Sequence, residues 1–392
     1  MKIVQLNVTC GSGSTGKICL AVSRLLSEKG VENYILYSEG SSDYPYGIKY
    51  TDELHIKLQA LRSRVLGTYG FNSQKITKKL IAELDRINPD IVHLHNLHGH
   101  GCNLTMLFKY FKEKKIKLYW TFHDCWAFTG YCPHFDMIGC DKWQSKCHSC
   151  EQKGAYSFFF DRSEELYEKK KDLFTGLDLT IITPSQWLAG LVKKSFLKDY
   201  EVKVINNGID LEAFRPAHSD FRKQYGIENE FVILGVAFNW DERKGIDVFK
   251  DLASTLPTDC RIVLVGTNEV VRQSLPKNII AIDRTENQHQ LAEIYTSADV
   301  FVNATREDTF PTVNIEALAC GTPVVTFDTG GSGEIIDESC GIKVAKNDTQ
   351  ALLEAIISIK ENKPFTAESC RKRAENFKAE EKYKQYVTNY EL

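Results

Sequence analysis

The chain has 392 residues, of which 43% are hydrophobic, and a formal net charge of −3 at pH 7. This length and apolar content predict two globular domains of ordinary size, and the slight negative charge excludes a general attraction to nucleic acid. No charged N-terminal segment precedes a long apolar run, and no window approaches the roughly 20 apolar residues of a membrane span, so we expect a cytoplasmic protein without signal peptide or transmembrane helix.

The first half of the chain alternates between strand-like and helix-like segments. Strands are expected at Lys2–Val8, Asn33–Ser38, Ile91–Leu94, Leu118–Phe122 and Leu179–Thr183. Helices are expected between them, notably at Lys17–Lys29 and Gln74–Ile87. Apolar residues recur on one stripe of the first of these helices, and a glycine ends it.

A glycine-rich segment, CGSGSTGKIC at residues 10–19, follows the first strand. It is one residue short of the P-loop of nucleoside triphosphatases, because Ile18 replaces the hydroxyl that would hold Mg²⁺. The strand at Ile91–Leu94 ends in His95 instead of an acidic residue, so the second metal ligand is missing too. An NTPase is therefore a disfavoured alternative.

The segment LHNLHGHG contains four histidines whose spacing could bind zinc: His93, His95, His98 and His100. No acidic or thiolate partner is adjacent in the sequence, so we favour a loop at the active site in which the histidines are incidental.

Five of the twelve cysteines lie between residues 125 and 150. Four of them, Cys132, Cys140, Cys147 and Cys150, have the spacing C-x7-C-x6-C-x2-C. Four thiolates that end in a CxxC pair can hold a structural zinc ion. Disulfides, which the cytosol disfavours, and free buried thiols are the alternatives.

The second half repeats the alternation. Strands are expected at Phe231–Ala237, Arg261–Val265, Ile279–Ile282, Val300–Asn303 and Pro323–Phe327, and the stretch Ala367–Leu392 is strongly helical and charged. Short apolar strands separated by helices indicate an α/β fold with parallel sheets covered on both faces. Turn-forming residues at Val204–Pro216 indicate a linker.

These patterns predict domains at residues 1–203 and 217–375, joined by the linker 204–216 and followed by a helix at 376–392 that packs back on the first domain. The first domain carries the cysteine-rich insertion at 125–150. Two α/β domains that face each other place a ligand cleft at the carboxyl ends of their strands.

The most informative stretch is NATREDTFPTVNIEALACGTPVVTFDTGGSGE at residues 303–334. Asp308 lies in a loop and Glu316, eight residues later, in a helix; two carboxylates so spaced can accept hydrogen bonds from sugar hydroxyls at two points of one ligand. The turn that contains Gly330 and Gly331 offers backbone N–H groups to phosphates.

Residues 316–325, EALACGTPVV, resemble the signature of the retaining glycosyltransferases of family 4, which have the two-domain GT-B fold. The likeness covers essentially the whole chain, and within the family it is strongest to bacterial colanic-acid and exopolysaccharide transferases. The resemblance implies two Rossmann-like domains, an N-terminal one for the acceptor and a C-terminal one for the nucleotide-sugar donor, with parallel sheets that face a central cleft and a C-terminal helix.

The resemblance also implies an activity. The protein would move a sugar from a nucleotide-diphosphate donor to a hydroxyl of a glycan, one linked to lipid, in the synthesis of a surface polysaccharide. No metal or other cofactor would be needed for catalysis. A protein that binds a nucleotide sugar without transferring it is the alternative, because Asp308 and Asn239 stand where the family has glutamate and arginine.

Individual roles follow from the motif matches. Glu316 would bind the nucleotide ribose and Asp308 the donor sugar. Lys244, with Arg243 beside it in GVAFNWDERKG, would hold the diphosphate, whose negative charge grows as the glycosidic bond breaks. His123, at the end of a strand, would line the reacting centre. The expected donor site is completed by Phe310, Gly330, Gly331, Gly13 and Gly16.

The stretch His55–Lys79 carries six Lys and Arg side chains among Leu, Ile and Phe. A basic amphipathic segment of this kind can contact an anionic membrane, which would suit a lipid-linked acceptor. An ordinary solvated helix is the alternative, and we favour it slightly.

Overall fold

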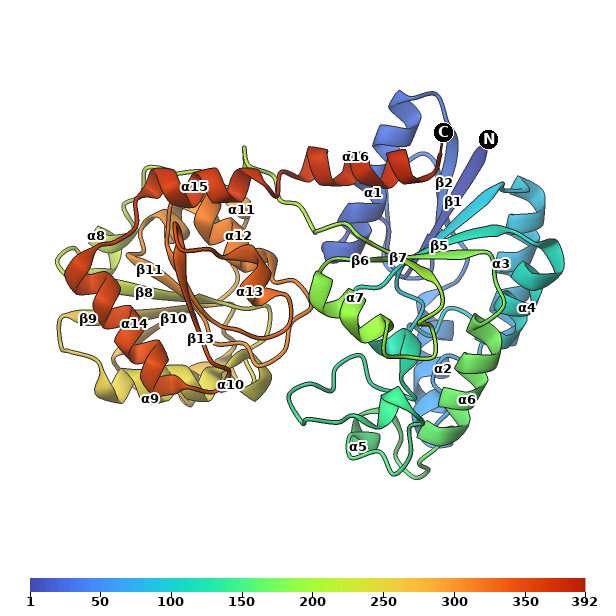
Figure 1. Ribbon diagram of the computed structural model, residues 1–392, viewed down its shortest axis with the longest axis horizontal. Helices are drawn as coiled ribbons and strands as arrows, with labels where there is room; N and C mark the ends of the chain where they lie inside the picture. Colours follow the sequence, from blue (N-terminus) through green and yellow to red (C-terminus); the bar gives the residue numbers. More distant parts are fainter. Residues whose placement is uncertain (392) are drawn as a thin grey trace. The chain divides into compact units, whose positions relative to one another are not determined.

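The structure is a computed structural model that describes residues 1–391. The chain divides into two compact units, one formed by Met1–Ile205 with the C-terminal segment from Tyr383 onward, and one formed by Asn206–Lys382. Each unit is a parallel sheet with helices packed around it (Figure 1).

The first unit holds a seven-stranded sheet in the order β3-β2-β1-β4-β5-β6-β7. Its strands are β1 (Lys2–Asn7), β2 (Glu32–Tyr37), β3 (Gly47–Lys49), β4 (Ile91–Leu94), β5 (Lys117–Thr121), β6 (Leu179–Thr183) and β7 (Glu201–Val204). All pairs are parallel. The central strand β1 buries every residue from Ile3 to Asn7, because helices cover both faces of the sheet.

The helices of the first unit connect these parallel strands. They are α1 (Gly13–Glu28), α2 (Glu53–Leu66), α3 (Gln74–Ile87), α4 (Leu104–Lys114), α5 (Lys153–Tyr156), α6 (Ser163–Phe174) and α7 (Gln186–Val192). Two short 3₁₀ turns, at Trp126–Phe128 and Lys142–Gln144, lie in the cysteine-rich segment.

The second unit holds a six-stranded sheet in the order β10-β9-β8-β11-β12-β13. Its strands are β8 (Phe231–Val236), β9 (Cys260–Val265), β10 (Ile279–Ile282), β11 (Val300–Asn303), β12 (Val324–Phe327) and β13 (Gly341–Val344). These pairs are parallel as well.

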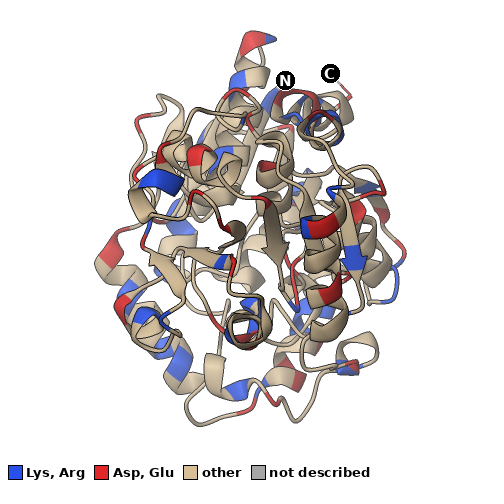
Figure 2. Ribbon diagram, turned by 90° about the vertical axis from the view of Figure 1, so that its left-hand side faces the viewer, with Lys and Arg blue, Asp and Glu red and all other residues tan. Residues whose placement is uncertain are grey.

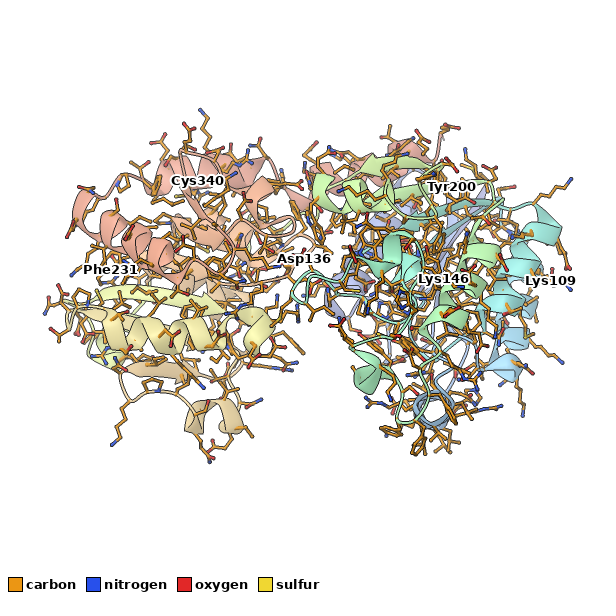
Figure 3. All side chains as sticks on the ribbon, turned by 60° about the horizontal axis from the view of Figure 1, so that its bottom comes forward. Lys109, Asp136, Lys146, Tyr200, Phe231 and Cys340 are labelled. Atoms are coloured by element: carbon orange, nitrogen blue, oxygen red, sulfur yellow. The ribbon has the colours of Figure 1, made fainter. Side chains whose placement is uncertain are left out.

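The helices of the second unit lie on both faces of that sheet. They are α8 (Phe221–Tyr225), α9 (Ile246–Thr255), α10 (Glu269–Gln273), α11 (Gln288–Thr296), α12 (Thr312–Ala319), α13 (Ser332–Ile335), α14 (Thr349–Asn362), α15 (Ala367–Glu375) and the first turn of α16 (Ala379–Asn389). Side chains fill the space between sheet and helices (Figure 3), in two apolar clusters.

Charged side chains are mixed over the helical surface. Both Lys or Arg and Asp or Glu occur on the helices that face the viewer in Figure 2. No helix among residues 1–391 is long and apolar enough to cross a membrane.

The helical stretch expected at residues 367–392 contains two helices, α15 and α16, and the second lies within the helix expected at 376–392. The chain leaves α15 near Asn376, where Phe377 O accepts a hydrogen bond from Ile209 N (2.9 Å) and Ile209 O accepts one from Ala379 N (2.9 Å). A Cβ on Gly208 would lie 2.4 Å from Ala379 Cα, so only glycine permits this close approach. The pairing with the linker segment therefore interrupts the helix.

Residues from α16 complete the core of the first unit. Tyr386, Val387 and Tyr390 are buried in a cluster with Ile3 and Val22. The hydroxyl group of Tyr119 in β5 also donates a hydrogen bond to the carbonyl oxygen of Asn389 (2.6 Å). The C-terminal segment is thus a structural part of this unit.

We expect Tyr386→Ala to lower the free energy of unfolding of the first unit by about 3–5 kcal/mol, because it removes a fully buried aromatic ring. Chemical denaturation measures the loss. Gln385→Ala, at an exposed position of the same helix, is the matched control and should cost less than about 0.5 kcal/mol. Equal losses for the two variants would contradict the described packing.

Candidate functional site

The order of strands reverses at the centre of the second sheet. Strands β8 and β11 are neighbours, and the chain continues outward from them in opposite directions. Loops at the carboxyl ends of such a strand pair diverge and leave room for a ligand. The loop after β8 carries Arg243 and Lys244, and the loop after β11 carries Asp308.

The structure brings two of the predicted residues together. Lys244 Nζ lies 2.6 Å from Asp308 Oδ2, and about one fifth of each side chain is exposed. The backbone N–H of Lys244 donates to Asp241 Oδ1 (2.9 Å), and that of Phe310 donates to Asp308 Oδ1 (3.2 Å). Both members of the ion pair are therefore held by their own loops.

Glycines let the loops after β8 and β12 approach the loop after β11. Gly245 has φ +77°, and a Cβ there would lie 2.4 Å from Ala304 O. Gly330 has φ +57°, and a Cβ there would lie 1.8 Å from Asp308 O. Gly331 N donates a hydrogen bond to the same Asp308 carbonyl (3.0 Å). The N–H of Gly331 is thus engaged within the protein, contrary to the expectation that it is offered to a phosphate.

Arg243 and the neighbouring Arg306 brace the loop after β11. Arg243 Nη1 donates to Glu307 O (3.3 Å). Arg306, which the sequence did not single out, makes a two-pronged ion pair with Asp247 in α9, at 2.8 and 2.6 Å. This pairing anchors the loop to the first turn of α9.

Glu316 lies in the second turn of α12. Its Oε2 accepts a hydrogen bond from the hydroxyl of Tyr295 (3.1 Å) and its Oε1 one from Thr312 (3.3 Å). Burial and the adjacent carboxylate raise the pKa of Tyr295 well above its ordinary value, so the phenol remains a donor. These contacts orient a half-buried carboxylate.

Two further residues of this region, Phe310 and Asn303, make contacts within the protein. Phe310 is buried, with its ring centroid 5.7 Å from that of Phe377, so in this structure it supports the loop and presents little surface to a ligand. Asn303, at the end of β11, donates to Asn314 Oδ1 in α12 (2.7 Å). Asn303 and Asn314 are both buried, and neither was singled out from the sequence.

In the first unit, His123 follows β5 and stacks on His95, whose ring in turn contacts that of His93. His123 Nε2 lies 3.2 Å from His95 Nδ1, and the ring of His95 stacks on that of His93 at 4.2 Å. Burial lowers the pKa of His123 to about 4 and that of His93 to about 3. These imidazoles are therefore neutral at pH 7.

His98 and Asp124 form a separate pair next to this stack. His98 Nε2 lies 2.8 Å from Asp124 Oδ2, and the N–H of Trp126 donates to Asp124 Oδ1 (2.9 Å). Burial alone raises the pKa of Asp124, but His98 and the Trp126 N–H lower it to about 2. Burial lowers the pKa of His98, but Asp124 raises it above its ordinary value.

Gly13 and Gly16 lie at the start of α1, which begins four residues earlier than expected. Gly11 N donates to Gly16 O (3.0 Å), and a Cβ on Gly16 would lie 2.6 Å from Thr9 Oγ1. The loop therefore closes on itself, and the side chain of Lys17 is exposed.

The four cysteines of the insertion lie near one another as free thiols. Burial raises the pKa of Cys132 to about 12 and that of Cys147 to about 11. Within residues 1–391, no three or more His, Cys, Asp or Glu side chains are arranged to hold a metal ion. The structural zinc ion and its alternatives therefore stay predictions.

A buried lysine accompanies these thiols. Lys170 Nζ donates to the carbonyl oxygens of Trp126 (2.7 Å) and Thr129 (3.0 Å) and lies 3.7 Å from the Trp126 ring centroid. Burial lowers the pKa of Lys170 to about 7. Its hydrogen bonds fix the segment that follows Asp124, a contact that sequence spacing does not reveal.

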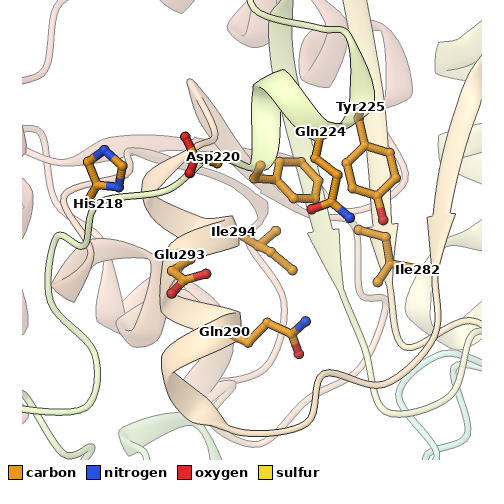
Figure 4. A pocket seen from close by; sticks show the side chains of 9 residues that line it. His218, Asp220, Gln224, Tyr225, Ile282, Gln290, Glu293 and Ile294 are labelled. Carbon is orange, nitrogen blue, oxygen red and sulfur yellow. The ribbon is translucent and has the colours of Figure 1, made fainter.

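A pocket of about 290 Å³ lies elsewhere in the second unit (Figure 4). It is formed by α8, the end of β10 and α11, and none of the predicted site residues lines it. The lining includes His218, Asp220, Gln224, Tyr225, Gln290 and Glu293. These six side chains are exposed, whereas Phe221 and Ile294, which also line the pocket, are buried. The pocket is therefore a shallow feature of the surface.

We expect Asp124→Asn to destabilise the first unit by about 3 kcal/mol, because it leaves a largely buried His98 without its anion. The pKa of Asp124 is lowered on folding from 3.8, so its contribution is present above that pH and is lost toward pH 2. The pKa of His98 is raised from 6.5, so its contribution is present below pH 6.5 and is lost above it.

The difference between wild type and variant should therefore be largest between about pH 4 and pH 6.5. Urea denaturation at several pH values measures it. Asp172→Asn, at an exposed position, is the control and should show no such profile. A difference that does not vary with pH would rule out the ion pair as its cause.

Comparison with known proteins places this geometry in a family. The model described as "Glycosyl transferases group 1" matches residues 228–362, and the model described as "Glycosyltransferase Family 4" matches residues 15–213. A colanic acid biosynthesis glycosyl transferase of Escherichia coli K12 is 24% identical over 378 residues, which are 90% of each chain.

Solved structures agree on the fold. Sucrose-phosphate synthase from Thermosynechococcus elongatus superimposes with a TM-score of 0.73 at 19% identity, over 100% of this chain and 98% of that one. HepE from Anabaena in complex with UDP-glucose gives 0.68 at 17% identity, over all of both chains. Since the family 4 model alone covers half of the chain, the protein belongs to glycosyltransferase family 4 and is a glycosyltransferase of the GT-B fold.

Proposed function

We propose that the protein transfers a sugar, with retention of anomeric configuration, from a nucleotide-diphosphate donor to a hydroxyl of a glycan. The Lys244–Asp308 pair carries this proposal. It places a cation and a carboxylate 2.6 Å apart on the loops at the carboxyl ends of β8 and β11. A cation binds the negatively charged diphosphate, and a carboxylate accepts hydrogen bonds from sugar hydroxyls. This pair provides both groups at one point.

The proposed roles follow from the chemistry of each group. Lys244, with Arg243 on the same turn, stabilises the negative charge that develops on the leaving diphosphate, and Asp308 accepts hydrogen bonds from the donor sugar. Glu316, oriented by Tyr295 and Thr312, accepts hydrogen bonds from the ribose. Because side-chain cations neutralise the leaving group, we propose that catalysis needs no metal ion.

His123, in the first unit, is proposed to line the reacting centre. Its low pKa makes it a neutral imidazole at pH 7, which can donate or accept a hydrogen bond without adding charge. The His95 contact orients its ring. Gly13 and Gly16 shape the neighbouring loop at the start of α1.

The acceptor and the biological role are proposed from the relatives. The Escherichia coli relative is named for colanic acid biosynthesis, and HepE was solved with UDP-glucose. We infer that the acceptor is a growing glycan, linked to lipid, in the synthesis of a surface polysaccharide at the cytoplasmic face of the membrane. An NTPase is disfavoured further, because the loop after β1 closes on itself and leaves Lys17 exposed.

Thermal stabilisation by a panel of UDP-, GDP- and ADP-sugars, each with EDTA, tests the donor site. A donor at about 100 times its dissociation constant should stabilise the protein by about 2.7 kcal/mol. We expect Glu316→Gln to weaken that donor by about tenfold to a hundredfold, because a charged hydrogen-bond acceptor is lost. Glu338→Gln, an exposed glutamate of the same unit, should bind as the wild type does.

Release of the nucleoside diphosphate in the presence of a glycan acceptor then separates an enzyme from a silent binder. Turnover that persists in EDTA supports the proposal. Stabilisation only by ATP with Mg²⁺, or equal donor affinity in the Glu316 and Glu338 variants, would overturn it.

A further inference from the structure

A buried glutamine lies against the histidines of the first unit. Gln5, in the central strand β1, is fully buried, and its side-chain amide contacts both α1 and His95. Its Nε2 donates to the carbonyl oxygen of Cys19 (2.9 Å) and to Ser23 Oγ (2.9 Å), both in α1. A carbonyl oxygen only accepts hydrogen bonds, so the amide atom that faces it has to be the nitrogen. Cys19 therefore fixes which way the amide points.

The orientation of Gln5 determines where His95 carries its proton. Gln5 Oε1 lies 3.2 Å from His95 Nε2, and burial lowers the pKa of His95 well below its ordinary value, so the imidazole is neutral at pH 7. An amide oxygen accepts but cannot donate, so the single N–H proton of His95 has to lie on Nε2. The other tautomer would set two lone pairs against each other at a buried position. His95 Nδ1 is then the acceptor nitrogen of the ring.

The same reasoning extends to His123. Its Nε2 lies 3.2 Å from His95 Nδ1, and the two rings are inclined by only 16°. Since His95 Nδ1 accepts, His123 Nε2 carries the proton and donates the hydrogen bond. His123 is also neutral at pH 7, so its Nδ1 keeps a lone pair. Gln5 and His95 are buried and His123 is partly exposed, so this series of hydrogen bonds runs outward from the core.

We propose that Gln5 and His95 are positioning residues that hold His123 in the tautomer with the proton on Nε2, so that its Nδ1 accepts a hydrogen bond from a hydroxyl of the bound sugar. The tautomer follows from the hydrogen bonds of the first unit alone. The contact with the sugar rests on the proposed function, which assigns His123 to the reacting centre. A neutral acceptor there orients a hydroxyl without adding charge beside the diphosphate.

Long-range proton–nitrogen correlation spectra of the full chain, with isotopically labelled histidines, report which ring nitrogen is protonated. The chain has ten histidines, and the signals that disappear in His123→Asn are those of His123. For the wild type at pH 7 we expect the chemical shift of a protonated nitrogen at Nε2 and of an unprotonated nitrogen at Nδ1. A proton on Nδ1 of His123 would overturn the proposal, whether or not the protein transfers a sugar.

Two variants test what holds the tautomer. Gln5→Met removes the acceptor of His95, so the hydrogen bond between the two histidines can reverse. We expect a mixture of His123 tautomers and a fall in kcat of about twofold to tenfold, with unchanged affinity for the nucleoside diphosphate. Ser23→Ala, the matched control, removes one hydrogen bond from the same amide but leaves that to Cys19, and should keep the wild-type tautomer.

A folded Gln5→Met variant that keeps the single wild-type tautomer would overturn the role of Gln5. Only variants whose thermal unfolding is cooperative, as that of the wild type, enter the comparison. Should Gln5→Met fail to fold, the spectrum of the wild type still tests the tautomer, because it needs no substitution.

Titration with a sugar nucleotide that stabilises the protein tests the contact with the sugar. A change in the Nδ1 shift of His123 that the nucleoside diphosphate alone does not produce supports a sugar hydroxyl at this nitrogen. An unchanged shift with the sugar nucleotide bound would overturn that contact. If no sugar nucleotide stabilises the protein, the proposed transfer fails and the contact with it, whereas the spectrum of the free protein still tests the tautomer.

Discussion

The ion pair between Lys244 and Asp308 is the interaction on which the candidate site of the second unit is built. Its members come from loops that leave neighbouring central strands, β8 and β11, in opposite directions. Two partly buried charges are tolerated only while they are paired, because loss of either partner leaves the other poorly compensated. Gly245 permits the approach of these two loops, since a Cβ there would collide with the carbonyl of Ala304, and Gly330 permits the loop after β12 to approach the carbonyl of Asp308 in the same way.

In the proposed function, the same pair would meet both halves of a sugar nucleotide. The two side chains pair with each other in this structure, and we propose that a phosphate takes over the lysine while sugar hydroxyls take over the carboxylate. The bracing around them is rigid: Arg306 binds Asp247 through two hydrogen bonds, and Asn303 ties β11 to α12. The buried polar groups of the first unit are of two kinds. Neutral imidazoles stack where the strand order reverses, and one charged pair, His98 with Asp124, lies beside them.

The prediction from sequence succeeded where the signal is local. Every strand whose residues form a short apolar run was found within one residue of its observed ends. The strands it missed, β3, β7 and β13, are edge strands of their sheets, where a partly exposed and more polar sequence carries no such run. The α/β fold class was predicted from the alternation of short apolar strands and helices, and the family from one contiguous motif. The separate C-terminal helix was expected from residue 376, close to the observed start of α16 at Ala379, but the pairing with residue 209 that separates it from α15 was not, because the two positions are far apart in the chain.

The candidate site was only half predictable for the same reason. Lys244 and Asp308 were each named, but their contact joins positions 64 residues apart and follows from topology alone. Gly331 was assigned to a phosphate, whereas its N–H binds the Asp308 carbonyl. The buried Lys170 looks like an ordinary member of a charged helix until burial is known.

The most direct measurement is a double-mutant cycle on the affinity for a nucleoside diphosphate, by titration calorimetry with the wild type, Lys244→Met, Asp308→Asn and the double variant. If the lysine holds the diphosphate and the carboxylate holds only the sugar, Lys244→Met weakens binding by about tenfold to a hundredfold. Asp308→Asn then leaves binding unchanged or stronger, because it frees the lysine for the phosphates. Equal weakening by both single variants, or no change in either, would contradict the account.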